Sequence, residues 1–249
     1  MRILAFTPTN PNEPYIWPRT VTSAHRAIKA FQGGSVGWVI SYHDNPYPDG
    51  HGNITHNYNK AIRMALDGGY DALLTIECDM VIPVDAIDGL LACDSDIAYS
   101  LYAWRHGMRN WSAYTEVAEM YGRTLSDEPD AARAAWGTII DVAGVGLGCT
   151  LIRRDALRHL NLRHSQYAAC DWYLAVDAQA AGLTQRANLA IVCGHCTYKP
   201  WPQIIWPSLD MRLHAVEPID GTVKMEPGQT YTYHVGMGNY TLYAEEVTP

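Results

Sequence analysis

Short apolar runs alternate with segments of helical periodicity through the first hundred residues. A short apolar or β-branched run predicts a strand, and apolar positions three or four residues apart predict a helix. The predicted strands are 2–6, 36–42, 72–76 and 97–102, and the predicted helices are 20–31, 55–66 and 83–91. Because strands that alternate with helices pair in parallel, the pattern predicts an α/β fold with a mixed, mainly parallel sheet flanked by helices. In such sheets, ligands bind beyond the carboxyl ends of the strands.

Boundary signals are clear in the first half of the chain and weaker in the second. Thr55 is suited to cap the second helix, and Pro83 to open the third. The later expected elements are helices over 127–136, 154–160 and 171–181, and strands over 138–142, 149–152 and 185–192. Beyond Pro200, loops rich in Pro and Trp lead to two or three short β segments from Thr222. We therefore expect a main α/β domain over residues 1–210 and a small β-rich appendage over 211–249, packed on it.

Composition limits the class of protein and its partners. The 249 residues are 48% hydrophobic, which is enough for a full core and excludes a disordered chain. A formal net charge of −8 disfavours non-specific binding to nucleic acid or anionic membranes over the whole surface. The apolar runs are too short to span a bilayer, and the first strand is followed at once by a polar, Pro-rich loop rather than a cleavage site. We expect a soluble, cytoplasmic protein whose six cysteines are free buried thiols.

Two acidic residues follow the predicted strand over 72–76, in the sequence Glu77-Cys78-Asp79. Carboxylates at the end of a buried strand are costly unless water or a cation compensates their charge. At this edge of an open α/β sheet, a divalent metal that holds a phosphate-bearing ligand is a natural partner. The alternative is an ordinary strand end with two surface acids, and the spacing alone leaves both interpretations open.

The motifs around these acids, taken in order, resemble the GT-A-fold glycosyltransferases over about residues 2–196. Before and at the acids they are Asn59-Lys60-Ala61, Ala65-Leu66, Gly69-Tyr70-Asp71, Leu73-Leu74, Glu77-Cys78-Asp79-Met80 and Pro83. After them come Asp96-Ile97-Ala98, Tyr102, Arg105, the glycine-rich strand and helix over 146–157, Asp171-Trp172-Tyr173, Ala181-Gly182-Leu183 and Cys193-Gly194-His195. Three positions depart from the family: Glu77 where Asp is commoner, Tyr58 where Arg often stands, and Cys170 in place of an acid.

The resemblance implies a GT-A-like fold and a transfer of sugar from a nucleoside-diphosphate sugar to an acceptor hydroxyl. In that family the acid-x-acid motif binds Mn²⁺ or Mg²⁺, which bridges the diphosphate. We expect Asp79, Glu77 and His195 to be the metal ligands, and this set suits Mn²⁺ at least as well as Mg²⁺. The alternative for His195 is an ordinary loop or surface histidine.

Asp171 is the expected general base. At a helix N-terminus the dipole stabilises its carboxylate, which can accept the proton of the acceptor hydroxyl. The alternative is a plain helix cap, because Asp is a preferred N-cap residue. A single base without an evident nucleophile opposite it favours direct displacement with inversion.

The expected donor-binding residues lie in loops that hold the base and ribose in the resembling family. Thr7, Pro8 and Thr9 end the first strand, Asp44 follows the second, and Asn59 and Arg105 complete the set. Asp44 could instead form a turn before Asn45-Pro46, and Arg105 could contact the acceptor or be an exposed loop residue. The stretch with Tyr198, Lys199, Trp201 and Trp206 is expected to close as a lid or to cover apolar surface.

Two rival functions stay open at the level of sequence. The first is a nucleotide-sugar-binding or carbohydrate-binding module without turnover. The second keeps the transferase but gives it a hydroxylated base in DNA as acceptor, steered by a basic cluster. That cluster is Arg153, Arg154, Arg158, His159, Arg163 and His164, which could equally be the solvated face of a helix. The acceptor is therefore a glycan, a small molecule or a modified nucleic acid.

Overall fold

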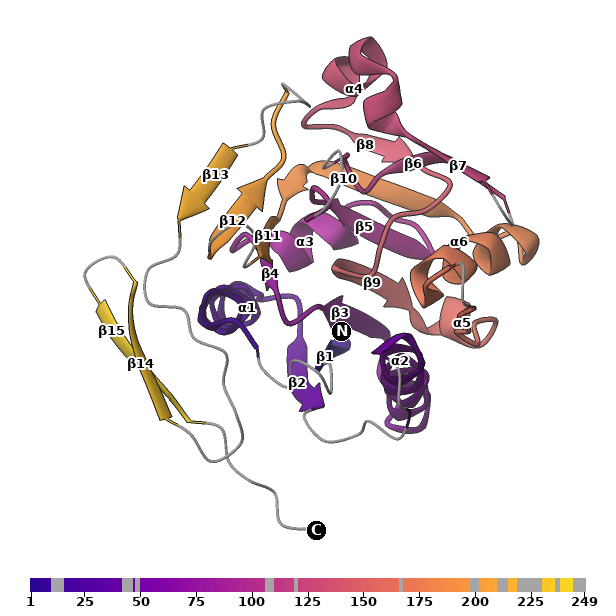
Figure 1. Cartoon of the computed structure of the whole chain (residues 1–249). Helices are drawn as coiled ribbons and strands as arrows, with labels where there is room; N and C mark the ends of the chain where they lie inside the picture. Colours follow the sequence, from indigo (N-terminus) through magenta and orange to yellow (C-terminus); the bar gives the residue numbers. More distant parts are fainter. Residues whose placement is uncertain are drawn as a thin grey trace.

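A seven-stranded mixed sheet runs through the centre of the computed structural model (Figure 1). The structure describes residues 1–9, 16–41, 47, 50–105, 110–118, 121–165, 168–197, 202–209, 215–218, 230–235 and 238–243. The strand order in the sheet is β2-β1-β3-β9-β5-β10-β8. The strands are β1 (Arg2–Pro8), β2 (Ser35–Ser41), β3 (Ala72–Ile76), β5 (Ile97–Leu101), β8 (Ile139–Asp141), β9 (Cys149–Arg153) and β10 (Gln185–Val192).

The direction of the strands confirms the expected α/β class. β1 pairs in parallel with β2 and β3, and β5 pairs in parallel with β10. β9 lies antiparallel between β3 and β5, and β8 is antiparallel at the edge. The reversed direction of β9 is not visible in the sequence, because a strand buried on both faces has the same apolar composition in either direction.

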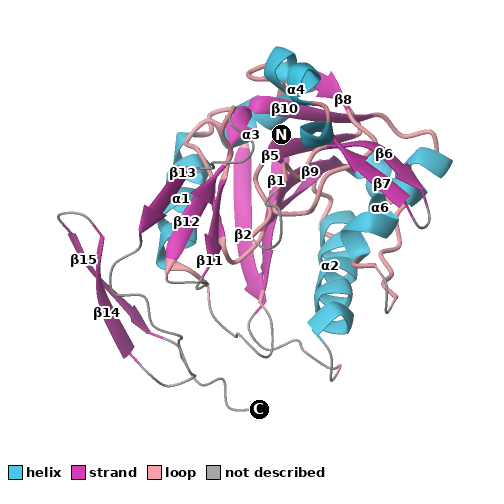
Figure 2. Cartoon of the chain, turned by 45° about the horizontal axis from the view of Figure 1, so that its top comes forward, coloured by secondary structure: helices cyan, strands magenta, loops and turns pink. Residues whose placement is uncertain are grey.

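Helices cover both faces of the sheet (Figure 2). α1 (Pro18–Ala30) packs beside α3 (Ala86–Leu91) on one face. α2 (Gly50–Asp67) packs against α5 (Arg154–Leu157) and α6 (Cys170–Ala180) on the other. The remaining short helices are the 3₁₀ turn η1 (Leu125–Asp127) and α4 (Pro129–Ala135).

Three expected helix boundaries are wrong. α2 begins at Gly50, so Thr55 lies inside the helix and is not its cap. α3 begins at Ala86, three residues after Pro83, because residues 83–85 form a turn that precedes the helix. The N-cap of α6 is Ala169, which makes Asp171 the second residue of the helix and not a capping residue.

A second, antiparallel sheet lies beside the first and was not expected. Its order is β13 (Ala215–Pro218), β12 (Gln203–Trp206), β11 (Gly194–Thr197) and β4 (Met80–Val81). In the pairing of β11 with β4, His195 stands opposite Met80. A two-residue strand leaves no periodicity to recognise, so sequence patterns could not reveal this pairing.

Two hairpins complete the described elements. β6 (Tyr114–Ala118) pairs with β7 (Tyr121–Thr124), and β14 (Thr230–Val235) pairs with β15 (Gly238–Tyr243). The second hairpin matches the β segments expected after Thr222, while the division into two domains at residue 210 stays a prediction. None of the described helices has the length and apolar character needed to cross a membrane.

Candidate functional site

The two acids of the Glu77-Cys78-Asp79 motif lie immediately beyond the carboxyl end of β3, where the sequence predicted them. The backbone N–H of Glu77 donates to the carbonyl of Gly148 at 2.9 Å, which ties the motif to the glycine-rich segment. The carbonyl of Asp79 accepts the N–H of Cys196 at 2.8 Å, which ties it to β11. The motif is therefore held from both sides at an edge where α/β sheets bind ligands.

The Asp79 carboxylate is buried and is shared between two basic side chains. Its Oδ2 atom accepts a hydrogen bond from the Arg105 guanidinium and lies 3.5 Å from Nε2 of His195. Burial alone would raise the pKa of Asp79, but Arg105 and then His195 outweigh it and hold this pKa below its usual range. Asp79 is therefore ionised at neutral pH, and the partly exposed Arg105 is its ion-pair partner.

His195 is buried, with only 7% of its surface exposed, so it is not a surface histidine. Its Nδ1 atom lies 2.8 Å from the carbonyl oxygen of Ala103. A carbonyl can only accept, so Nδ1 carries the hydrogen, and in the neutral ring Nε2 presents a lone pair. Nε2 has no hydrogen-bond partner and faces the Asp79 carboxylate. Two lone pairs that face each other need a proton or a cation between them, and this histidine arrangement is typical of metal ligands.

Glu77 points to a different neighbour. Its Oε1 atom accepts a hydrogen bond from the Tyr58 hydroxyl at 3.3 Å. Burial, together with the negative charges of Asp79 and Asp171, raises the pKa of Glu77 to about 8. Among the residues that the structure describes, no three His, Cys, Asp or Glu side chains are grouped so that they could hold a metal ion. The structure brings Asp79 and His195 together, and metal binding by this pair, with Glu77 as third ligand, stays a prediction.

Asp171 lies in the first turn of α6, on the other side of the glycine-rich segment. A Cβ atom added at Gly146 would lie 1.8 Å from Oη of Tyr102 and 3.1 Å from Oδ2 of Asp171. The chain can pass between these two side chains only because residue 146 has none. The charge of Asp171 contributes to the raised pKa values of both Glu77 and Tyr102, so the two carboxylates belong to one electrostatic site.

The predicted donor-binding residues of the first strand lie at the carboxyl ends of β1 and β2. Thr7 accepts the indole N–H of Trp38 at 3.0 Å, and the Thr9 hydroxyl donates to the carbonyl of Ser41. Both threonines are buried, and Pro8 is the last residue of β1. Their position is the expected one, and their contact with a donor stays a prediction.

Asn59 has a structural contact that the sequence did not reveal. Its side-chain amide donates to the carbonyl of Leu162 at 2.7 Å and accepts the Leu162 N–H at 2.9 Å. These two bonds fasten the segment after α5 to α2. Contact between Asn59 and a donor stays a prediction.

Asp44 falls outside the described residues. So do three residues of the expected lid, Tyr198, Lys199 and Trp201. Trp206 is described, and its indole N–H donates to Glu217 at 3.2 Å. A Cβ atom at Gly194 would lie 2.9 Å from the Trp206 ring. These contacts favour the interpretation of Trp206 as a cover over β11.

The basic cluster over residues 153–164 is engaged by protein groups. Arg153 donates to the carbonyl of Ser95, and Arg154 donates to the carbonyls of Leu66 and Tyr70. Arg158 and Arg163 form ion pairs with Asp155 and Asp177. Arg153 and Arg154 therefore bind backbone carbonyls, and the charges of Arg158 and Arg163 are neutralised by neighbouring acids. These contacts do not support a surface that attracts nucleic acid.

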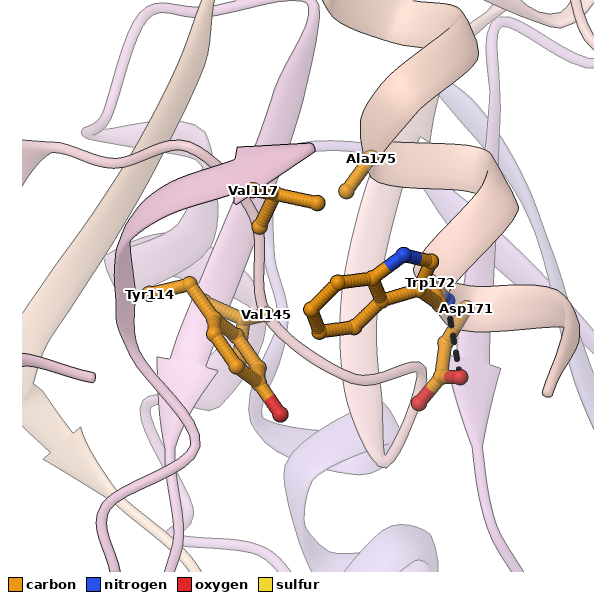
Figure 3. A pocket seen from close by; sticks show the side chains of 6 residues that line it. All are labelled: Tyr114, Val117, Val145, Asp171, Trp172 and Ala175. Atoms are coloured by element: carbon orange, nitrogen blue, oxygen red, sulfur yellow. Dashed lines mark hydrogen bonds between the residues drawn. The ribbon is translucent and has the colours of Figure 1, made fainter. Parts of the chain in front are cut away.

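A pocket beside Asp171 was missed by the sequence analysis. It is lined by Tyr114, Val117, Val145, Asp171, Trp172 and Ala175 (Figure 3). The two residues from β6 were not predicted, because no element was expected between residues 102 and 127. The β-favouring residues Tyr114, Thr115 and Val117, followed by a second short run from Tyr121, are a hairpin signal that could have revealed them.

Comparison with known proteins supports the fold. No protein-family model matches the chain, and no curated protein matches it significantly. Among solved structures, A197 from STIV matches with a TM-score of 0.56 at 16% identity, covering 92% of this chain and all of A197. The fold is GT-A-like.

Several of the other structural neighbours are glycosyltransferases. TarS from S. aureus, residues 1–349, matches with a TM-score of 0.45 at 11% identity, covering 75% of this chain and 58% of TarS. A glycosyltransferase involved in glycosylation of the major capsid of PBCV-1 matches with a TM-score of 0.36 at 10% identity, covering 64% of this chain and 63% of that enzyme. The similarity to these enzymes is distant.

Proposed function

We propose that this protein is a metal-dependent glycosyltransferase, which moves a sugar from a nucleoside-diphosphate sugar to an acceptor hydroxyl with inversion. The observation that carries the proposal is the facing pair of Asp79 Oδ2 and His195 Nε2, 3.5 Å apart beyond the end of β3. The buried imidazole has its tautomer fixed by Ala103 and its Nε2 atom without a hydrogen-bond partner. This arrangement suits a divalent cation, Mn²⁺ or Mg²⁺, at a sheet edge where GT-A-like folds place the donor.

Asp79 and His195 would hold the metal, with Glu77 as the further candidate. A metal bound there supplies a Lewis acid that stabilises the diphosphate leaving group and orients it. The fixed Nδ1–H contact keeps His195 pointed at Asp79 without rearrangement. Arg105 donates to the same Asp79 oxygen, so it would compete with a cation for this oxygen. Its guanidinium would also offset negative charge of a diphosphate bound there.

Asp171 is the proposed base. Its carboxylate lies in the first turn of an eleven-residue helix, where the helix dipole stabilises negative charge. It borders the pocket described above, so an acceptor hydroxyl placed there would have its proton within reach. Thr7, Pro8 and Thr9 lie at the adjoining strand ends and are the proposed contacts for the nucleotide.

A thermal-shift screen with nucleotide sugars tests the proposal. UDP-GlcNAc, which one of the TarS structures contains, is the first donor to include, with and without Mn²⁺. A donor at 100-fold its Kd stabilises the folded state by about 2.7 kcal/mol, which gives a measurable rise in Tm. We expect the rise to need both donor and metal. If no nucleotide sugar raises Tm in the presence of Mn²⁺ or Mg²⁺, the proposal is wrong.

The second candidate function is a nucleotide-sugar-binding module without turnover. It is favoured by Cys170, a thiol in place of the acid that the resembling family has before Asp171. This module would bind the donor equally well in the wild type and in Asp171→Asn. It would catalyse neither transfer of the sugar nor hydrolysis of the donor, whereas the proposed enzyme hydrolyses its donor slowly in the absence of acceptor.

A further inference from the structure

The N-terminal part of α1 binds the chain segment that carries Asp79. α1 packs beside β4, which directly follows the acidic motif (Figure 1). The carbonyl oxygen of Cys78 accepts two hydrogen bonds from α1: the backbone N–H of Trp17 donates at 2.8 Å, and the Thr20 hydroxyl donates at 3.1 Å. A carbonyl oxygen has two lone pairs, and these two bonds use both. The direction of the Cys78 carbonyl is therefore fixed by the helix.

Ser23 binds the other end of the same segment. Its Oγ atom accepts the backbone N–H of Ile82 at 3.1 Å and donates to the carbonyl of Thr20 at 3.1 Å. Positions 17, 20 and 23 are three residues apart, so they lie on neighbouring turns along one side of α1. This side of the helix therefore holds the segment 78–82 at both ends.

These contacts fix both peptide groups that flank the Cα atom of Asp79. Because a peptide group is planar, fixing the Cys78 carbonyl also fixes the N–H of Asp79. The carbonyl of Asp79 is fixed in turn by the N–H of Cys196 in β11. The direction of the carboxylate then depends only on the side-chain torsions of Asp79. Since β11 also carries His195, α1 and β11 together set the carboxylate against the imidazole.

The hydroxyl of Thr20 is buried, and its bond to Cys78 explains why a polar side chain stands there. Thr20 has no exposed surface, and a hydroxyl at such a position costs free energy unless it is hydrogen-bonded. The other buried positions of α1 are apolar: Pro18, Ala24 and Ala27. Packing of α1 against the sheet therefore does not require a hydroxyl at position 20.

Resting on the function proposed above, we propose that Thr20, supported by Ser23, is a positioning residue of the metal site, which holds Asp79 in the orientation that faces its carboxylate to His195. Both residues act through the backbone of the acidic motif and touch neither metal nor substrate. Ligands that are already in place bind a cation more tightly, because less freedom is lost on binding. If α1 only packed on the sheet, the loss of the Thr20 hydroxyl would change stability and leave the Asp79–His195 geometry as it is.

¹⁵N NMR of the histidine side chains tests the proposal in the metal-free protein. The signals of His195 are those missing from the spectrum of His195→Gln. Thr20→Val should shift the His195 signals, because it removes one of the two bonds that fix the peptide group before Asp79. Thr20→Ser keeps the hydroxyl and should restore the wild-type signals. Thr22→Val, the matched change at a partly exposed position of α1, should leave them in place.

The affinity for Mn²⁺ gives the second readout. Thr20→Val should weaken Mn²⁺ binding about fivefold, which corresponds to the loss of one hydrogen bond. Ser95→Ala is the stability control, because it removes a buried hydroxyl that donates to the Ile97 carbonyl at 2.8 Å, at the opposite edge of the sheet. This control should lower the free energy of unfolding and leave Mn²⁺ affinity unchanged. If Thr20→Val does not fold, Ser23→Ala replaces it and should change both readouts in the same direction.

The two readouts separate failure of the positioning role from failure of the proposed function. Wild-type His195 signals and wild-type Mn²⁺ affinity in a folded Thr20→Val would overturn the positioning role alone. An equal loss of Mn²⁺ affinity in Ser95→Ala would also overturn it, because the effect would then follow stability. A wild type that binds no Mn²⁺ would reject the proposed function, and the His195 signals of the metal-free variants would still decide whether Thr20 positions Asp79.

Discussion

At the Asp79–His195 site, one buried carboxylate oxygen faces both a guanidinium and an imidazole, whereas the Asp171 carboxylate borders a pocket with aromatic and aliphatic walls. The glycine-rich segment contacts both regions, because Gly148 accepts a hydrogen bond from the Glu77 backbone and Gly146 lies against Asp171. The first region concentrates opposite charges, which suits a charged donor and a cation. The second places the Asp171 carboxylate beside aromatic and aliphatic side chains. In the proposed function, the first region stabilises the leaving group and the second accepts the proton.

The largest effect should come from the base. Asp171→Asn keeps the shape of the side chain but removes its ability to accept the proton of the acceptor hydroxyl. We expect kcat to fall by about 10²–10⁴-fold, while donor affinity stays near that of the wild type. Steady-state kinetics with the donor found in the screen, together with its Kd, measure both values. Full activity in this variant would show that Asp171 is not the base, and the region around it would then have no catalytic role separate from the Asp79–His195 site.

The next effect should come from the segment between the two regions. Gly146→Ala places a methyl group where Tyr102 Oη would be 1.8 Å away, so the tyrosine or the backbone must move. We expect the free energy of unfolding to fall by about 1–3 kcal/mol, as for other overpacked sites. In a Tyr102→Phe background the loss of unfolding free energy should be smaller, because the Tyr102 hydroxyl, the atom nearest to the added methyl group, is absent. Denaturant unfolding of the four proteins in this double-mutant cycle measures the difference, and an equal loss in both backgrounds would contradict the close contact.

A smaller effect should come from Arg105. Its guanidinium competes with a metal for Oδ2 of Asp79, so Arg105→Gln should tighten Mn²⁺ binding in the absence of donor. A partly exposed ion pair contributes about 1 kcal/mol at most, which corresponds to about fivefold in Kd. The same variant should weaken donor binding, because it removes a positive charge from the diphosphate site. Titration calorimetry with Mn²⁺ and then with donor measures both changes. Weaker Mn²⁺ binding in Arg105→Gln would show that Arg105 supports the metal rather than competing with it.

A further effect should be a change in how stability depends on pH. The folded protein raises the pKa of Glu77 from its ordinary value of 4.5 to about 8, so folding favours the protonated form. The stabilisation from this group is complete below about pH 4.5 and is lost as the pH rises through about 8. In Glu77→Gln this loss is absent. Denaturant unfolding of both proteins at pH 5 and pH 9 in EDTA should show a smaller decline for the variant, and an equal decline would contradict the shift.

The sequence predicts the charged region better than the apolar one, for physical reasons. Asp79 closely follows β3, whose apolar run can be recognised without tertiary information, and Asp171 lies in the first turn of α6. The order of motifs placed His195 with them by resemblance. Its pairing with Met80 through β11 depends on a two-residue strand, which has no periodicity of its own.

The pocket shows the opposite case. Its walls come from β6, the glycine-rich segment and α6, which are far apart in the sequence and meet only after the sheet forms. Gly146 was expected only as part of the glycine-rich strand and helix over 146–157, and the structure shows that it is a point of close approach. The sequence alone cannot distinguish a glycine needed for close approach from one needed for a turn. Asn59 illustrates a related limit, because a motif position does not reveal that its amide binds the backbone of Leu162.

Binding of Mn²⁺ to Asp79 and His195 is the central claim, and an electron paramagnetic resonance titration of free Mn²⁺ tests it most directly. The titration needs neither donor nor acceptor. The account predicts one Mn²⁺ site in the wild type, lost in Asp79→Ala and in His195→Ala, and kept in the control Asp94→Ala, which changes an exposed carboxylate. A wild type that binds no Mn²⁺, or Asp79→Ala and His195→Ala variants that bind it as tightly as the wild type, would contradict the account.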